Sequence, residues 1–218
     1  MKQKTFLSIA ESTVKAGISM IPLVGGPISS IIGDISQERY KKRIKEFIDN
    51  VNKALSNRLE EIDHEKISKE DFQDIFSNCF QAILTNRIAE KRTAFTNILI
   101  NTIAYNNISF DESEYMMKLI DNLTLKHLIC MEELSKVKIP DYIEGVAETT
   151  LRTISEKYEL FEDDVFESIK DLENYNIAQG FTSQYLARGG RGGVVLTGIG
   201  SYLTVKGEKL LSNIKIQI

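Results

Sequence analysis

Apolar residues recur every three or four positions through most of the first half of the chain, which is the spacing of one face of an α-helix. A first stripe ends at Ile21, and a second runs from Ile28 to Ile62 with a slip near residues 36–40. Two more stripes occupy residues 72–84 and 88–103. Because the connections between these segments are short, we expect an antiparallel bundle of long helices with an Ile- and Phe-rich interior.

Polar residues that cap helices precede two of these stripes. Ser68 and Asp71 have the spacing of a capping box, in which a hydroxyl and a carboxylate accept hydrogen bonds from free amides at a helix start. Asn86 can cap the stripe that follows. We therefore expect one helix to begin just after Ser68 and another to begin just after Asn86.

A polar segment at residues 106–111 follows the last of these stripes. Asp111 and Glu114 then have the spacing of another capping box, which indicates that a new helix starts here. We expect a domain boundary at this segment. The predicted organisation is a helical bundle in residues 1–108 and a second domain in residues 111–218.

The second domain begins with helical patterns and ends with a strand-like one. Helices are expected to start near Thr124, Pro140 and Asp163, and each start is followed by apolar residues at helical spacing. Strand-forming residues then fill positions 177–186 and 194–204.

A glycine-rich segment lies between the two strand-like runs and contains Arg188 and Arg191. Glycine in this position predicts the tip of a β-hairpin. Residues 203–211 (LTVKGEKLL) return to a short helical pattern. The predicted fold is therefore mainly α, with an α+β second domain that contains one hairpin.

The stretch from Ala16 to Gly33 has no charged residue, and it would cover about 27 Å as a single helix, close to the thickness of a bilayer core. Pro22 and the following Gly-Gly-Pro instead predict a helix stop, a turn and a second helix start. One interpretation is a turn buried in a helical core, and the other is a tip that enters a membrane or drives self-assembly. The residues of this candidate tip are Ile21, Pro22, Gly25, Gly26, Pro27, Ile28, Ser30, Ile31 and Gly33.

Basic residues gather soon after this stretch and form what we call the basic collar. Basic groups near an anionic membrane surface contribute about 1 kcal/mol each to binding, so the collar is a candidate lipid contact. The alternative is an ordinary solvated helix face. The collar consists of Arg39, Lys41, Lys42, Arg43 and Lys45.

Composition limits the partners and the cellular compartment that we expect for the protein. A net charge of −4 argues against a surface given over entirely to nucleic acid. Cys79 and Cys130 lie within apolar helical patterns, which predicts two buried free thiols in a reducing compartment. Charged residues interrupt the first apolar segment, so we expect no signal peptide. The expected location is the cytoplasm, with the inner membrane as a candidate peripheral site.

The order of elements after residue 113 resembles a winged-helix domain, in which three helices lead into a hairpin wing and a segment like residues 203–211 closes the fold. The whole chain also resembles a group of bacterial helical-bundle proteins without assigned activity. Their pattern is matched here by Ile21–Pro27, by Glu90–Arg92 and by the winged-helix-like end. This resemblance implies a fold, and no catalytic residue comes with it.

Winged helices commonly bind DNA through their third helix, but the charge of that helix is unfavourable here. A DNA duplex carries one negative charge per roughly 1.7 Å, which repels carboxylates at the contact. Only Arg188 and Arg191 in the expected wing favour phosphate, so we expect nucleic-acid binding to be weak. The charged residues of residues 163–174 are Asp163, Asp164, Glu167, Lys170, Asp171 and Glu173.

Patterns typical of enzymes are missing from the sequence. His64 lies in a charged linker and His127 lies on a helix, and neither has a further ligand at metal-binding spacing. No nucleophile elbow, phosphate-binding loop or dinucleotide fingerprint is present. We therefore expect no catalytic, cofactor-binding or metal-binding residues.

Three classes of function remain. We favour a non-enzymatic bacterial interaction or effector protein of a defence or toxin type. In it the C-terminal module binds a protein partner, and the N-terminal bundle forms a homo-oligomer or acts conditionally at a membrane. The alternatives are a winged-helix transcriptional regulator that binds DNA and a structural adaptor.

Overall fold

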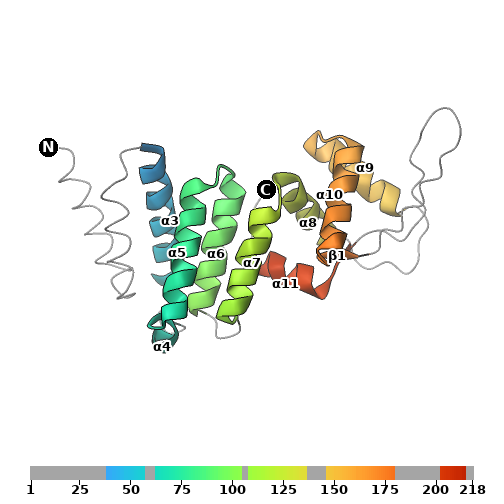
Figure 1. The fold of residues 1–218 in the computed structure, drawn as a ribbon. Coiled ribbons are helices and arrows are strands. Elements are labelled where there is room, and N and C mark those ends of the chain that lie inside the picture. Colours follow the sequence, from blue (N-terminus) through green and yellow to red (C-terminus); the bar gives the residue numbers. More distant parts are fainter. Residues whose placement is uncertain (1–37, 57–61, 105–107, 137–145, 180–201, 215–218) are drawn as a thin grey trace, which may run out of the picture. The chain divides into compact units, whose positions relative to one another are not determined.

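The computed structural model describes residues 38–56, 62–104, 108–136, 146–179 and 202–214, which are mainly helical, as predicted (Figure 1). The chain divides into two compact units, residues 1–122 and 123–218.

The first unit consists of helices that pack side by side. In Figure 1, α3, α5, α6 and α7 follow one another across this unit. Polar contacts show antiparallel pairs: Arg43 near the start of α3 reaches the carbonyl of Leu84 at the end of α5, and Lys91 near the start of α6 reaches the carbonyl of Asp121 in the last turn of α7. The helices are α3 (Glu38–Ser56), α4 (His64–Ile67), α5 (Glu70–Thr85), α6 (Ala89–Ala104) and α7 (Phe110–Asn122).

Phenylalanine rings fill the centre of this unit. The ring of Phe47 on α3 lies 6.1 Å from that of Phe76 and 6.0 Å from that of Phe80, both on α5. Burying each such ring contributes about 1.5–3 kcal/mol. The apolar stripe predicted at residues 72–84 is confirmed as a buried face of α5. Helix α6 is buried over most of its length because α3, α5 and α7 all pack against it.

Helix α7 belongs to the first unit, although the boundary predicted from the sequence lies before it. It packs against α5 and α6, so the division between the units follows Asn122 instead of residues 106–111. Its cap also differs from the prediction at Asp111 and Glu114. The helix begins at Phe110, and the hydroxyl of Ser109 accepts a hydrogen bond from the amide of Glu112.

The predicted capping box at Ser68 and Asp71 is wrong. Helix α5 starts at Glu70 without a side-chain cap, and the Ser68 hydroxyl donates instead to the carbonyl of Glu65 in the short helix α4. Asp63 caps α4 by accepting from the amide of Lys66. The side chain of Asn86 accepts from the amide of Ile88 just before α6, which agrees with its predicted role.

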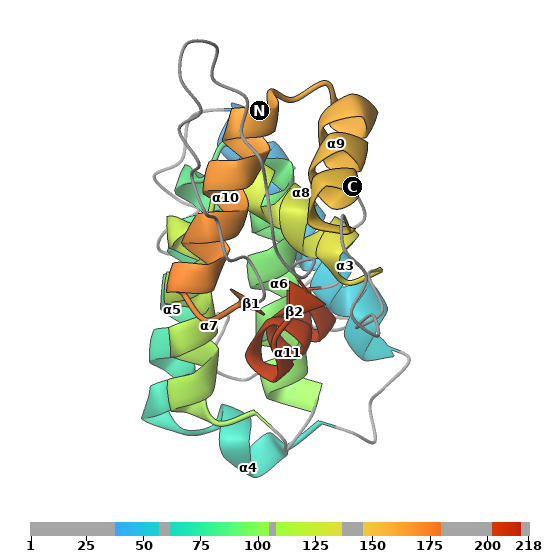
Figure 2. The same ribbon diagram turned by 90° about the vertical axis from the view of Figure 1, so that its right-hand side faces the viewer.

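In the second unit, α8, α9 and α10 pack against one another, and Figure 2 shows α9 and α10 on either side of α8. Strands β1 (Ala178–Gln179) and β2 (Tyr202–Leu203) pair antiparallel, with Ala178 opposite Leu203. Helix α11 follows β2 and packs on α8. The helices are α8 (Leu125–Leu134), α9 (Val146–Tyr158), α10 (Glu162–Asn174) and α11 (Val205–Ile214).

Contacts at the start of α11 show how the predicted segment 203–211 is held in place. Thr204 donates its amide to the carbonyl of Ile177 over 2.9 Å, and its hydroxyl oxygen accepts from the amide of Gly207 over 3.1 Å. A Cβ atom at Gly207 would lie 2.1 Å from the Ile177 carbonyl oxygen, so this position requires glycine. The chain turns after α10 at Asn176, whose φ of 55° lies in the left-handed region.

Both cysteines are buried and free, as predicted. Burial raises the pKa of the Cys130 thiol to about 12 and raises the pKa of Cys79 further. The Cys79 thiol donates to the carbonyl of Phe95 over 3.3 Å. Both thiols are therefore core groups held in their protonated form.

Candidate functional site

Two of the three predicted sites lie outside the described residues. The first is the candidate tip, which comprises Ile21, Pro22, Gly25, Gly26, Pro27, Ile28, Ser30, Ile31 and Gly33. The second is the candidate pair of wing contacts, Arg188 and Arg191. In the part of the chain that is described, no helix is long and apolar enough to cross a membrane.

The basic collar lies on the first turns of α3, and two of its members are neutralised locally. Lys41 forms an ion pair with Glu38 at 2.9 Å, one turn earlier on the helix. Lys42 pairs more loosely with Glu46, at 3.7 Å. Lys45 is exposed to solvent. These three lysines therefore resemble an ordinary charged helix face, since exposed pairs of this kind contribute at most about 1 kcal/mol.

The collar arginines are arranged differently. Arg43 turns toward α5 and donates a hydrogen bond to the backbone carbonyl of Leu84. Arg92 on α6 reaches the same helix end and donates to the carbonyls of Asn86 and Arg87, at 3.2 and 3.0 Å. Carbonyls at a helix C-terminus carry partial negative charge, which favours cations there. The two guanidinium groups thus converge on the connection between α5 and α6.

Tyr40 brings Arg39 into the same group. The guanidinium carbon of Arg39 lies 4.7 Å from the centre of the Tyr40 ring, and that of Arg43 lies 5.9 Å from it. Burial lowers the pKa of Arg43, and the positive charges of Arg92 and Arg39 lower it further. We call Arg39, Arg43 and Arg92 the arginine cluster. Arg92 was not among the predicted site residues, although an antiparallel arrangement places the start of α6 beside the start of α3.

The acidic face predicted for the third helix of the second unit is present on α10. Asp164 forms a 2.7 Å ion pair with Lys126 on α8. Next to this face, the side chain of Phe161 is 80% exposed. The face is therefore predominantly negative and carries one large apolar group at its start. The exposed charged residues of α10 are Glu162, Asp163, Glu167, Lys170 and Asp171.

His127 on α8 has a structural role. Its Nδ1 accepts a hydrogen bond from the amide of Thr124 at 2.8 Å, while the Thr124 hydroxyl accepts from the His127 amide, so the pair forms a capping box. The other ring nitrogen, Nε2, lies 3.3 Å from a carboxylate oxygen of Asp171 on α10. An acceptor at Nδ1 leaves the proton on Nε2, which donates to Asp171. The imidazole therefore caps α8 and ties it to α10.

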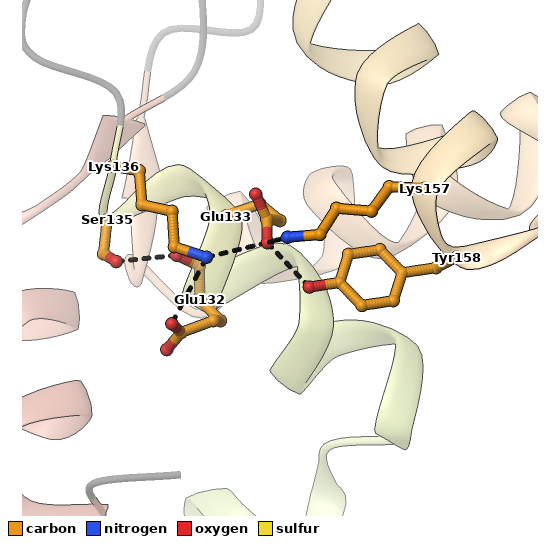
Figure 3. Close-up of polar contacts among 6 residues, drawn as sticks. All are labelled: Glu132, Glu133, Ser135, Lys136, Lys157 and Tyr158. Carbon is orange, nitrogen blue, oxygen red and sulfur yellow. Dashed lines mark hydrogen bonds and ion pairs between the residues drawn. The ribbon is translucent and has the colours of Figure 1, made fainter. Parts of the chain in front are cut away.

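Glu133 is the centre of a polar network in the second unit (Figure 3). One of its carboxylate oxygens lies 2.8 Å from Lys136 Nζ, 2.7 Å from Lys157 Nζ and 2.6 Å from the Tyr158 hydroxyl. Lys136 also pairs with Glu132 at 3.4 Å. Since Lys157 and Tyr158 lie on α9, the network joins the end of α8 to the end of α9.

The electrostatics of Glu133 favour a structural role over proton transfer. Burial by itself raises the pKa of this carboxyl, but the hydrogen bonds from Lys136, Lys157 and Tyr158 outweigh burial and hold the pKa at about 2. A general acid or base works best with a pKa near the operating pH. The Glu133 carboxylate stays ionised at neutral pH and is occupied by its three donors.

The described residues hold no group of three metal-ligating side chains. His64 lies at the start of α4 and His127 is engaged as described above. In comparisons with protein-family models, with curated proteins and with solved structures, no match to this chain was found.

Proposed function

We propose that the chain is a non-enzymatic bacterial interaction protein of the effector type, in which the second unit binds a protein partner. The first unit, as a helical bundle, would then form homo-oligomers or act conditionally at a membrane. The observation that carries this proposal is the exposed surface of α10, which bears four carboxylates and one lysine. Such a face suits a partner with basic residues.

The arrangement of the second unit supports a winged-helix-like module used for protein contact. Three packed helices lead through a short antiparallel strand pair into a final helix. In such a module, α10 would correspond to the helix that DNA-binding winged helices place in a DNA groove. Its negative charge disfavours that use, because phosphates repel carboxylates at contact distance. The same charge favours association with a basic protein surface.

Charge reversal on α10 tests this proposal. Asp163 and Glu167 are exposed and lie one turn apart, so an Asp163→Lys/Glu167→Lys variant leaves the core untouched. An isogenic strain expressing the tagged variant should lose the partner that the wild-type protein co-purifies. A Glu159→Lys/Glu208→Lys variant makes the same change of charge at other exposed positions and should retain the partner.

The partner identified in this way should bind the purified wild-type chain directly, with an affinity that falls as salt concentration rises. Equal binding by all three proteins would remove α10 from the interface. The DNA-binding regulator remains the alternative, supported by the order of elements alone.

A further inference from the structure

The arginine cluster gathers three positive charges on a small part of the first unit. Arg43 and Arg92 donate to carbonyls only two residues apart, those of Leu84 and Asn86. Arg39 donates to the hydroxyl of Tyr40 over 2.9 Å and lies against the ring that Arg43 also approaches. Two helices and the connection between α5 and α6 therefore build one basic surface.

No described carboxylate forms an ion pair with this cluster. Among the described residues, no acidic group lies within ion-pair distance of any of the three guanidinium groups. The nearest acidic residues along α3, Glu38 and Glu46, pair with lysines instead. A guanidinium has five N–H donors, and the carbonyl contacts use few of them. The carboxylate of Glu46 acts on Arg43 only at longer range, so the cluster combines net positive charge with spare donors.

We propose that Arg39, Arg43 and Arg92 form a binding site for a phosphate group carried by the lipid headgroups of an anionic membrane. Planar guanidinium groups bind phosphate oxygens in pairs, which a point-like ammonium does not. The membrane is the source indicated by the chain itself, because α3 begins shortly after the uncharged stretch that ends at Gly33. The proposal deepens the membrane role proposed for the first unit and rests on it.

Exposed lysines extend the basic surface along α3. Lys42 lies one turn beyond Arg39, and Lys45 lies one turn beyond Lys42. Their contribution is the diffuse attraction of any basic helix to anionic lipid. The arginine cluster differs because its guanidinium groups are held in place by carbonyls and by an aromatic ring. Docking through such a site precedes any insertion of the uncharged stretch and does not require it.

Vesicle flotation with the purified full chain tests the site. Arg39→Gln is the informative variant. The side chain of Arg39 contacts Tyr40 and no backbone carbonyl of the described α5–α6 connection is bonded to it, so the substitution leaves the carbonyl contacts of Arg43 and Arg92 intact. Lys53→Gln is the matched control, an exposed residue with the same charge change about 21 Å further along α3. The vesicles are phosphatidylcholine alone and phosphatidylcholine mixed with phosphatidylglycerol.

The wild-type chain should float with the anionic vesicles only. Arg39→Gln should lower partitioning about fivefold, which corresponds to about 1 kcal/mol per basic residue, while Lys53→Gln should change it by less than twofold. Arg39→Lys should recover only part of the loss, since it keeps the charge and loses the paired donors.

Three results would overturn the site. Equal binding to neutral and anionic vesicles leaves a membrane role but removes the arginine site. Binding to neither removes the membrane role, and it removes the site as well if pyrophosphate has no Arg39-dependent effect. Equal losses in Arg39→Gln and Lys53→Gln indicate diffuse charge only. In a parallel arm, inorganic pyrophosphate is titrated against the thermal unfolding of the same proteins. An Arg39-dependent rise in melting temperature without vesicle binding would assign the site to a soluble phosphate compound.

Discussion

The ammonium of Lys91 on α6 donates a hydrogen bond over 2.6 Å to the backbone carbonyl of Asp121, in the last turn of α7. Lys66 makes the equivalent contact at the other end, donating over 2.6 Å to the carbonyl of Ile108, just before α7. Burial lowers the pKa of both lysines, because each ammonium is partly removed from water and loses part of its hydration. Helix α7 is therefore attached to the first unit at both of its ends.

We expect Lys91→Met to weaken this attachment. A hydrogen bond from a charged donor contributes about 1.5–3 kcal/mol, and removing a partly desolvated ammonium offsets some of the loss. The free energy of unfolding should fall by about 1 kcal/mol. Hydrogen exchange should quicken in the last turn of α7. Lys118→Met, an exposed change on α7 itself, serves as the control and should leave both measurements unchanged.

Exchange rates that are identical in Lys91→Met and wild-type protein would show that apolar packing alone holds α7. In that case its assignment to the first unit would still stand, because α5 and α6 both pack against it. The lysine contacts would then report the position of the helix without determining it.

The helices of the first unit were predictable from their apolar spacing, whereas their partners were not. The stripe at residues 72–84 follows the helical period closely, so its buried face could be read directly. The four-residue helix α4 is too short to show a period, and the cap at Ser68 was therefore assigned to the wrong helix. The place of α7 depends on contacts such as that between Thr102 and Ser113, which a local pattern does not contain.

The candidate sites also differ in whether they lie within one helix or depend on packing between helices. The negative face of α10 followed from the sequence because its charges lie within one helix. The arginine cluster did not, because Arg92 joins Arg43 only through the antiparallel packing of α3, α5 and α6. The network around Glu133 likewise combines residues from α8 and α9.

Substitution of Gly207 should destabilise the second unit. The added Cβ of Gly207→Ala would lie 2.1 Å from the carbonyl oxygen of Ile177, a backbone atom that cannot move without disturbing the bond from Thr204. We expect a loss of about 2–4 kcal/mol in the free energy of unfolding, at the upper end for single substitutions. Ser212→Ala, on the exposed side of the same helix, should change stability by less than about 0.5 kcal/mol.

Thermal unfolding followed by circular dichroism measures both variants. A Gly207→Ala protein as stable as Ser212→Ala would mean that α11 can shift away from Ile177. The strand pair between β1 and β2 would then be less firmly placed than its hydrogen bonds indicate.

Glu133 should make the stability of the second unit depend on acidity. Its pKa is about 2 in the folded chain and 4.5 ordinarily, so the folded state binds the proton less tightly than the unfolded state does. The resulting stabilisation is fully present above pH 4.5 and is lost as the pH falls toward 2. We expect about 1–2 kcal/mol, because the two lysine partners are half-exposed and solvent screens them.

Glu133→Gln should remove this acid-dependent component, and the measurement is chemical denaturation at a series of pH values between 6 and 2.5. Glu132→Gln is the control, since the one ion pair that Glu132 makes with the described residues is the longer 3.4 Å pair with Lys136. If both variants keep the wild-type slope of stability against pH, the donors around Glu133 do not hold its pKa down.

DNA binding separates the favoured function from its first alternative. The exposed face of α10 carries four carboxylates and Lys170, so the wild-type chain should bind duplex DNA weakly and without sequence preference. Fluorescence anisotropy at physiological salt measures this affinity.

Asp163→Lys/Glu167→Lys adds four units of positive charge to α10 and should raise non-specific affinity roughly tenfold if that helix approaches the duplex. Any residual wild-type binding should disappear in Arg188→Ala/Arg191→Ala, since those arginines are the candidate phosphate contacts of the wing. Submicromolar binding of the wild-type chain to one sequence, lost in that double variant, would favour the transcriptional regulator, because wing contacts would then have outweighed the repulsion from α10.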